Sequence, residues 1–242
     1  MHGQSNQEYS QPSLEAAEAL CRSCVPADGS VTPDELYDLR AIQIQALESW
    51  ARENGSVVTK DALPALQERT NEHLVAFREA DSRWVKVTKP GRFGYIADTD
   101  FSWDKTSQRW IGSIVLREAL PSEYLARLIL QNEVFEDAVL LEGILITRDT
   151  GLSLVSSQPD ISGDPSSLTE IFESMEQSEF EKIPGLHLGY VSSLSFYRRI
   201  DAVAVFDAHP ANAVTSHGVV FPIDFIIQRV SSLMKEQIEN MI

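Results

Sequence analysis

The sequence predicts an α+β protein built as two lobes. Strand-forming runs gather in the first half of the chain, around one prominent helix. A polar stretch, "DISGDPSS", separates that half from a mixed second half near residues 158–167. Strands and helices do not alternate as they would in a doubly wound parallel sheet. We therefore expect a mobile N-terminal arm (1–30), a helix plus a strand-rich N-terminal lobe (31–158), and a reduced C-terminal lobe (159–242).

The clearest predicted helix is "TPDELYDLRAIQIQALESWARENG". Thr32 and Glu35 form a capping-box pattern, Pro33 suits the first turn, and Gly55 follows the end. Its apolar residues recur at helical intervals, so one face should cover a neighbouring sheet. The expected residues of that face are Leu36, Leu39, Ile42, Leu47 and Trp50.

The cysteines of "CRSC", Cys21 and Cys24, allow three interpretations. A CxxC pair can be a redox couple or half of a zinc site. The chain has no second CxxC, and a closed zinc site needs four ligands. We favour the third interpretation, in which both cysteines lie on one face of a short helix that continues "SLEAAEAL".

Two hairpins and three further helices are expected along the remaining chain. "EHLVAF" and "RWVKVT" alternate in polarity around "READS", and "YIADTDFSW" and "RWIGSIVLREA" flank "DKTSQ", so that Trp103 and Trp110 can pair. "LPSEYLARLILQNEVF" is predicted as a helix, followed by the strands "AVLLEGILI" and "LSLVSSQP" around "RDTG". A helix near 168–180, the strands "AVAVF" and "GVVFPIDFII", and a helix from about Ser231 complete the chain.

Composition excludes several classes of function. The hydrophobic share of 43% is that of an ordinary globular chain, and no apolar run reaches the roughly 20 residues of a membrane span. A net charge of −16 repels phosphate backbones and anionic membranes, so we expect neither nucleic acid nor membrane as a partner. The N-terminus lacks a signal-peptide pattern and there are only two cysteines, so a cytoplasmic location is expected.

Two apolar runs near the C-terminus are each followed by an aspartate. Asp207 follows "AVAVF", Asn212 comes five residues later, and Asp224 follows "VVFPI". Mg²⁺ prefers hard oxygen ligands and is commonly held by one or two protein groups together with phosphate oxygens. Asn212 and Asp224 are therefore candidate metal ligands, and Asp207 is a candidate to accept or orient a hydroxyl proton. Each aspartate alone can also be an ordinary turn residue.

A lysine and a glutamate upstream are candidates for the cationic part of the same site. Lys86 lies between Val85 and Val87 in "WVKVT", where it either contacts a ligand or faces solvent on a half-exposed strand. Glu123 can pair with it, or can complement the dipole of its own helix, and Glu133 is the competing partner.

Other charged groups receive less specific interpretations. His209 forms a D-x-H with Asp207, and we favour a structural histidine over a metal ligand. "KPGRFG" is expected to be a plain loop, with Lys89 in the turn. Arg198 and Arg199 form one compact basic spot, expected to be solvated.

Taken together, "EHLVAF", "VKVTKPGRFG", "PSEYLARLILQNEVF", "LVSSQPDISG", "FDAHPANAV" and "PIDFIIQR" resemble the kinase-like domain of phage and mobile-element polyvalent proteins. "HPAN" and "ID" are also similar to motifs of aminoglycoside and choline kinases, and the D-x-x-x-x-N spacing matches the protein-kinase catalytic loop. The resemblance implies a protein-kinase-like fold and phosphoryl transfer from ATP with Mg²⁺. It implies that Lys86, aligned by Glu123, contacts the phosphates of ATP and that Asp207 orients the acceptor hydroxyl. It also implies that Asn212 and Asp224 hold the metal, and that Gln158 lies in the hinge where the nucleotide base binds.

The sequence also departs from the kinase pattern. No G-x-G-x-x-G loop precedes Lys86, Ile226 replaces the glycine of D-F-G, and only 18 residues follow Asp224. These departures motivate an alternative, a catalytically inactive kinase-like module that binds a partner. A third hypothesis is a mobile-element accessory protein that acts through its acidic surface. The sequence leaves the phosphate acceptor, protein or small molecule, undefined.

Overall fold

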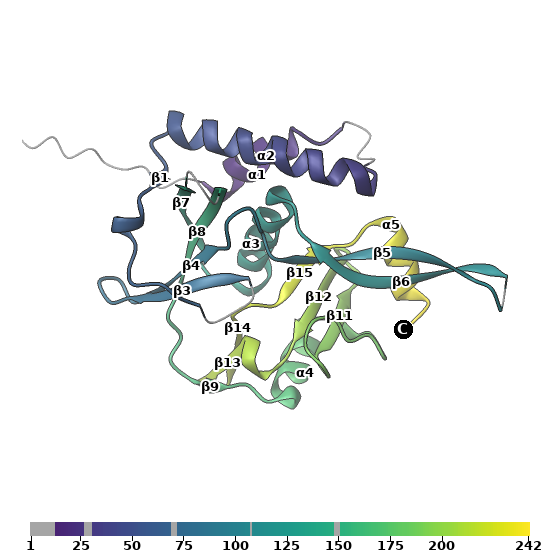
Figure 1. Ribbon diagram of the computed structural model, residues 1–242. Coiled ribbons are helices and arrows are strands. Elements are labelled where there is room, and N and C mark those ends of the chain that lie inside the picture. Colours follow the sequence, from purple (N-terminus) through teal and green to yellow (C-terminus); the bar gives the residue numbers. More distant parts are fainter. Residues whose placement is uncertain (1–12, 27–30, 69–71, 107, 148–150) are drawn as a thin grey trace, which may run out of the picture. The chain divides into compact units, whose positions relative to one another are not determined.

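The computed structural model describes residues 13–26, 31–68, 72–106, 108–147 and 151–242, and it confirms the α+β class (Figure 1). The described residues form two compact units. Unit 1 contains those up to Phe93, together with Leu120–Leu125 and Val139–Gln158. Unit 2 contains Gly94–Ala119, Ala126–Ala138 and Pro159–Ile242. No helix among the described residues has both the length and the apolarity needed to cross a bilayer.

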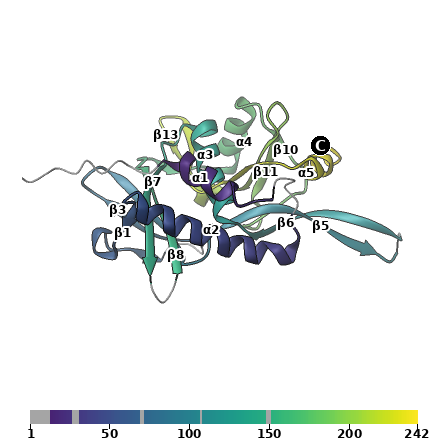
Figure 2. The same cartoon turned by 90° about the horizontal axis from the view of Figure 1, so that it is seen from above.

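Unit 1 begins with two helices that contact each other, α1 (Leu14–Arg22) and α2 (Pro33–Glu53) (Figures 1 and 2). The predicted capping box is present, because the Thr32 hydroxyl accepts from the Glu35 N–H and the Glu35 carboxylate accepts from the Thr32 N–H. The buried face of α2 repeats every four residues, and the helix contacts β7 (Leu140–Thr147). That face consists of Leu39, Gln43, Leu47 and Ala51.

Two expectations for this region need correction. Ile42, expected on the covered face of α2, is half exposed, because the buried stripe turns past it to Gln43. Helix α1 is the short helix expected for "SLEAAEAL", and Cys21 is fully buried in it, but Cys24 lies just beyond its end, so the two cysteines do not both lie on one face of that helix. Residues 1–12 and 27–30 of the expected mobile arm lie outside the described residues.

The sheet of unit 1 has six strands in the order β1-β7-β8-β4-β3-β2. The predicted antiparallel hairpin is β3 (His73–Arg78) with β4 (Arg83–Thr88), and β7 pairs antiparallel with β8 (Gly151–Pro159). The "RDT" of the predicted turn between β7 and β8 lies outside the described residues. Val85, Val87 and Val155 form a small core that joins β4 to β8. Two short edge strands, β1 (Val57–Val58) and β2 (Gln67–Glu68), and a 3-10 turn (Lys60–Ala62) were not predicted.

Unit 2 contains the second predicted hairpin, a long ribbon of β5 (Tyr95–Asp104) and β6 (Arg109–Glu118) (Figure 1). Trp103 and Trp110 are directly opposite, and their rings meet edge to face with centroids 5.7 Å apart, as predicted. The ribbon was expected in the first lobe, but its residues belong to the second compact unit. The predicted helix α3 (Pro121–Phe135) contributes its first turn to unit 1 and the rest to unit 2.

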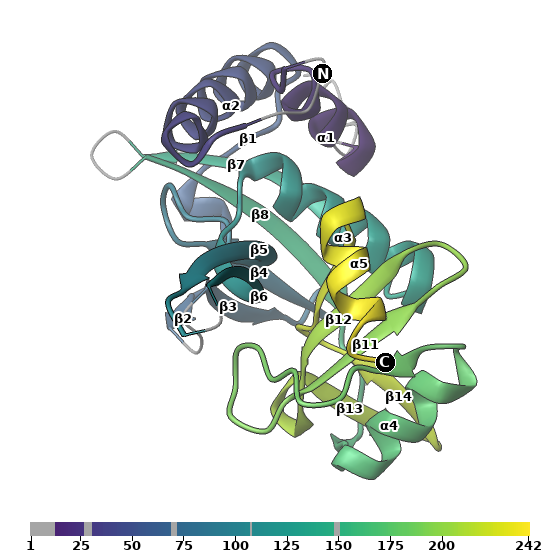
Figure 3. The same ribbon diagram turned by 90° about the vertical axis from the view of Figure 1, so that its right-hand side faces the viewer.

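Two further sheets complete unit 2. One has the order β10-β11-β12-β15, with bounds Glu181–Lys182, Leu194–Arg198, Val203–Ala208 and Ile226–Arg229. The other has the order β14-β13-β9, with bounds Val219–Pro222, Ala213–Ser216 and Asp164–Pro165. Helix α4 (Leu168–Gln177) contacts β11 and β14 (Figure 3). Helix α5 (Ser232–Glu239) begins where predicted and contacts β5 and β6, and the structure adds that the Ser231 hydroxyl caps it.

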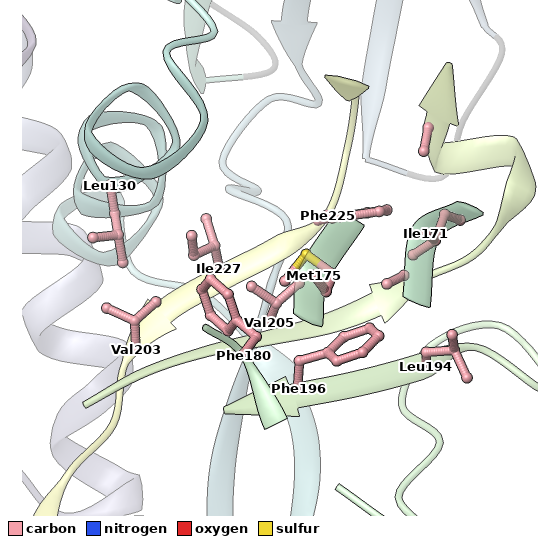
Figure 4. Packing of buried hydrophobic residues seen from close by; sticks show 12 residues of the cluster. Leu130, Ile171, Met175, Phe180, Leu194, Phe196, Val203, Val205, Phe225 and Ile227 are labelled. Atoms are coloured by element: carbon pink, nitrogen blue, oxygen red, sulfur yellow. The ribbon is translucent and has the colours of Figure 1, made fainter. Parts of the chain in front are cut away.

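The main core of unit 2 lies between α3, α4 and the strands β11, β12 and β15 (Figure 4). Phe196, Val205 and Ile227 come from three adjacent strands, and all are buried. Every residue of β12 from Val203 to Phe206 is inaccessible, because one face meets this cluster and the other meets a second cluster with Ile183 and Met234. Strand β12 is thus packed on both faces, and this packing fixes the position at which the residues after Phe206 leave the core.

Candidate functional site

Asp207 is the partly accessible residue of strand β12, whose other residues are buried. Its backbone has φ +56°, a left-handed conformation that is uncommon for a residue other than glycine. Its carboxylate lies against the loop of residues 188–193, where Oδ1 accepts from the Tyr190 N–H at 2.7 Å. Gly189, at φ +80°, makes this approach possible, because a Cβ there would overlap the Asp207 carboxylate. Asp207 is therefore held on one side by a loop that lies earlier in the chain.

Asn212 connects Asp207 to Asp224. A short 3-10 turn (Pro210–Asn212) follows His209 and places the Asn212 side chain under the end of β12. Its Nδ2 donates to the backbone oxygen of Asp207 at 3.2 Å, to Asp207 Oδ2 at 3.3 Å and to the backbone oxygen of Asp224 at 3.3 Å. The antiparallel pair β13–β14 brings the chain back, so that the Ile223 N–H donates to the Asn212 backbone oxygen at 2.8 Å. The hairpin is thus the reason why residues 212 and 224 meet.

Asp224 is fixed by an arginine of helix α3. Arg127 Nη2 donates to Asp224 Oδ1 at 2.9 Å and to the Asp224 backbone oxygen at 3.3 Å, and Arg127 Nε donates to the Phe225 oxygen at 3.1 Å. The Arg127 side chain is 6% exposed and that of Asp224 is 22% exposed. The single strand predicted for "GVVFPIDFII" is two strands, β14 and β15, and Asp224 lies in the bend between them, because Ile223 and Asp224 leave the β14 ladder.

The electrostatics of Asp207 are those of a carboxyl group withdrawn from water. Burial raises the pKa of Asp207 above its ordinary value and the Asp224 charge adds to the rise, although the Tyr190 N–H, His209 and Arg127 oppose it. His209 Nδ1 accepts from the Ala211 N–H at 3.3 Å, so a neutral imidazole carries its proton on Nε2, which lies 3.6 Å from Asp207 Oδ1. A carboxyl group with a raised pKa is suited to exchanging a proton with a ligand.

The structure brings together three of the predicted site residues, Asp207, Asn212 and Asp224, within unit 2. The other three predicted site residues, Lys86, Glu123 and Gln158, belong to unit 1. Lys86 is half buried on β4, on the opposite face from Val85 and Val87, as its alternation predicts.

Within unit 1, Glu123 makes a local hydrogen bond and Gln158 is buried. Glu123 Oε2 accepts from the Leu120 N–H at 2.8 Å, so this carboxylate caps the first turn of its own helix. Gln158 is buried near the end of β8. Glu133, the competitor of Glu123, forms an exposed ion pair with Arg229 in unit 2, with 3.1 Å between Oε2 and Nη2.

Sequence reasoning missed three residues of this site: Arg127, Gly189 and Tyr190. Arg127 gave one usable signal, since it lies between Leu125 and Leu128 on a helix that is otherwise largely buried. A charged group on a buried face needs a partner, and the aspartates of the chain were candidates. Tyr190 and Gly189 gave none, because their role depends on a contact with a residue 17 positions later in the chain.

The remaining predicted groups are explained by the structure. Arg198 pairs with Asp201, and Arg199 pairs with Glu181, so the basic spot is balanced by acidic neighbours rather than merely solvated. His209 caps the 3-10 turn through Nδ1, and its ring lies 4.7 Å from that of Tyr190, in agreement with the structural interpretation.

The "KPGRFG" segment is a loop, as expected. Within it the Gly91 N–H donates to the Leu152 oxygen at 2.8 Å, which ties the loop to β8 of unit 1.

No family model matches this chain, and neither the curated proteins nor the solved structures contain a match. The site joins two aspartates through the Asn212 amide nitrogen; one carboxylate is paired with a guanidinium and the other has a raised pKa.

Proposed function

We propose that this protein is a kinase-like phosphotransferase that uses ATP and Mg²⁺ to phosphorylate a hydroxyl group on a protein or small molecule. One observation carries the proposal: the Asn212 amide bonds to both Asp207 and Asp224. A D-x-x-x-x-N segment and a later aspartate are the groups that kinases use to orient the acceptor and hold the metal. Their convergence within unit 2 supports a common site over two unrelated turns.

The donor atoms fit magnesium. Asn212 uses its Nδ2 for all three of its side-chain hydrogen bonds among the described residues, so its Oδ1 faces no protein donor there. Asp224 supplies carboxylate oxygens, one of which already accepts from Arg127. Amide and carboxylate oxygens are hard ligands of the kind Mg²⁺ takes from proteins. When bound, the ion would neutralise phosphate charge, which this acidic chain otherwise repels.

The residues have distinct roles in this proposal. Asp207 orients the acceptor hydroxyl and accepts its proton, a task helped by its raised pKa. Asn212 fixes the Asp207 carboxylate through Oδ2, so that the base keeps one orientation. Lys86 contacts the phosphates, Glu123 orients Lys86, and Gln158 contacts the base of the nucleotide. Catalysis is then chiefly positioning and charge stabilisation.

The proposed fold is two-lobed and kinase-like, with a reduced C-terminal lobe. The order of elements along the chain supports it: the strand of Lys86 comes before the helix that begins near Glu123, and that helix comes before the strand that contains Gln158. The first and last of these strands are neighbours in the sheet, joined by the Leu154 N–H, which donates to Thr88 Oγ1 at 3.0 Å. A lysine strand beside the strand that leads out of the unit is what a nucleotide site of this kind requires.

A second candidate function is a catalytically inactive kinase-like binding module. The observation that favours it is the Arg127–Asp224 ion pair, because a guanidinium on the metal ligand competes with the metal. The absence of a glycine-rich loop before Lys86 in the sequence also favours it.

Two measurements test the proposal. Millimolar ATP with Mg²⁺ should raise the unfolding temperature, and neither ATP alone nor the Asp224→Asn variant with Mg²⁺ should reproduce the full rise. Transfer of radiolabelled γ-phosphate to an added acceptor mixture, or hydrolysis to water, should be lost in Asp207→Asn while ATP binding stays. Asp38→Asn, on the exposed face of α2, is the charge-matched control.

The outcomes separate the two candidates. Binding with no turnover in the wild-type chain would favour the inactive module. No thermal shift at millimolar ATP, or full turnover in Asp207→Asn, would contradict the phosphotransferase.

A further inference from the structure

A second candidate site lies in unit 2, between the β5–β6 ribbon and helix α5. Its cavity has a volume of about 640 Å³. Phe101 and Trp110 line it from the ribbon, and Leu233 and Met241 line it from α5 and the residues that follow. All four are more than a third exposed, so they present apolar surface to solvent at one place. Aromatic side chains beside a hollow are typical of protein-binding sites.

One polar group in the wall of this cavity has no partner. Gln237 lines the cavity, and both its Nε2 and its Oε1 are inaccessible and make no hydrogen bond among the described residues. The amide lies directly over Gly112 of β6, where a Cβ would overlap Gln237 Nε2. An unpaired buried donor and acceptor cost stability. Because both atoms are covered in the unliganded chain, a ligand reaches them only when the Gln237 side chain turns into the cavity that it lines, and a ligand that then supplies the missing acceptor and donor recovers this cost.

A nearby glutamine indicates what kind of ligand fits. Gln228 Oε1 accepts from the Ala97 N–H at 2.8 Å, and Gln228 Nε2 donates to the Ala97 oxygen at 2.9 Å. In this unit a glutamine side chain thus pairs with both backbone groups of one residue on β5. Gln237 offers the same donor and acceptor beside β6, with no hydrogen-bonded backbone opposite it among the described residues. Its complement is the N–H and C=O of one residue of an extended peptide.

The charge of the cavity selects among peptides. Glu236 is the charged residue that lines it, and Asn240 and Met241 follow the C-terminus of α5, the negative end of that helix. The whole chain carries −16. An anionic segment is disfavoured here, whereas a lysine or arginine next to an apolar side chain meets complementary charge.

We propose that this cavity binds a short extended peptide of a partner protein, in which a large apolar side chain is flanked by basic residues. The apolar side chain lies between Trp110 and Leu233, and one backbone residue pairs with the Gln237 amide. This site is independent of the proposed phosphotransfer, because none of its lining residues belongs to the group of Asp207, Asn212 and Asp224.

The test uses two blocked peptides, acetyl-Lys-Phe-Leu-Lys-amide and acetyl-Glu-Phe-Leu-Glu-amide, with the full chain. Nuclear magnetic resonance follows the Gln237 side-chain amide and the Trp110 indole during titration. The basic peptide should shift both signals and bind at least about tenfold more tightly than the acidic one. Gln237→Met, which keeps the side-chain length, should weaken binding about tenfold, the value of one to two neutral hydrogen bonds.

A stability measurement separates a binding role from a structural one. Gln237→Met removes two unpaired polar atoms, so the unfolding temperature should stay the same or rise. Gln228→Met is the matched control, and its unfolding temperature should fall because it breaks two hydrogen bonds to Ala97.

Several results would overturn the proposal. They are equal binding of both peptides, unchanged binding in Gln237→Met, and a fall in the unfolding temperature of Gln237→Met like that of Gln228→Met. Equal binding of 4-ethylphenol to wild type and Gln237→Met, with no peptide binding, would also overturn it.

Discussion

Replacing Arg127 with methionine should destabilise this protein by about 3 kcal/mol. Arg127 is 6% exposed and donates one hydrogen bond to the Asp224 carboxylate and two to backbone oxygens. Removing one partner of a buried ion pair costs roughly 3–5 kcal/mol, because the attraction between the two charges is lost while the remaining charge stays largely withdrawn from water. Asp224 keeps 22% of its side-chain surface in water, which places the expected loss at the lower end.

Thermal unfolding followed by circular dichroism measures this loss. For a chain of this size, about 3 kcal/mol corresponds to a fall in unfolding temperature of roughly 6–12 °C. Arg229→Met is the matched control, because Arg229 forms an ion pair with Glu133 in which both side chains are more than half exposed. Such surface pairs contribute about 0–1 kcal/mol. If Arg127→Met loses no more stability than Arg229→Met, the Asp224 bend is not held by this arginine.

Two further predictions concern Asp207. Gly189→Ala should displace the Asp207 carboxylate and lower any activity that depends on it. Gly185→Ala is the control, because its φ of +69° is similar but no atom lies within 4 Å of the new Cβ. This control should show only the backbone strain of roughly 1–2 kcal/mol. Equal unfolding temperatures and equal activities in the two variants would contradict the crowding around Asp207. The second prediction concerns pH. Burial raises the pKa of Asp207 in the folded chain, so the folded chain binds this proton more tightly than the unfolded chain. The ionised Asp207 therefore lowers the stability of the fold at neutral pH, and this loss disappears as the pH falls through the raised pKa. As the pH is lowered from about 7 to about 4, the stability of wild type relative to Asp207→Asn should therefore rise. Titration of the carboxyl carbon resonance should place the pKa of Asp207 above its usual range. A pKa below that range would refute the assignment.

Local patterns were enough to predict most elements. The Thr32–Glu35 capping box and the Trp103–Trp110 pair depend on residues that are close in sequence, so short-range rules identify them. The short strands β9 (Asp164–Pro165) and β10 (Glu181–Lys182) escaped prediction, because two-residue strands have no periodicity of their own and exist only through their partners.

Part of the candidate site could also be predicted from the sequence, and part of it required the structure. Asp207, Asn212 and Asp224 could be chosen from spacing and residue type, because the chemistry of oxygen ligands is a property of the side chains themselves. That Asn212 bonds to both aspartates follows from the return of the chain through β13 and β14. Arg127 enters from a helix almost a hundred residues earlier, and no local pattern connects it to Asp224.

By itself, the sequence determined the α+β class, the capping box of α2, the β3–β4 and β5–β6 hairpins and the acidic character of the chain, since these depend on neighbouring residues and on composition. Only the tertiary structure decided which charges meet, which carboxyl group is withdrawn from water, and which amide in a cavity wall is left without a partner among the described residues. The physical reason is that pairing and desolvation are set by distances through space, whereas capping and alternation are set by separation along the chain.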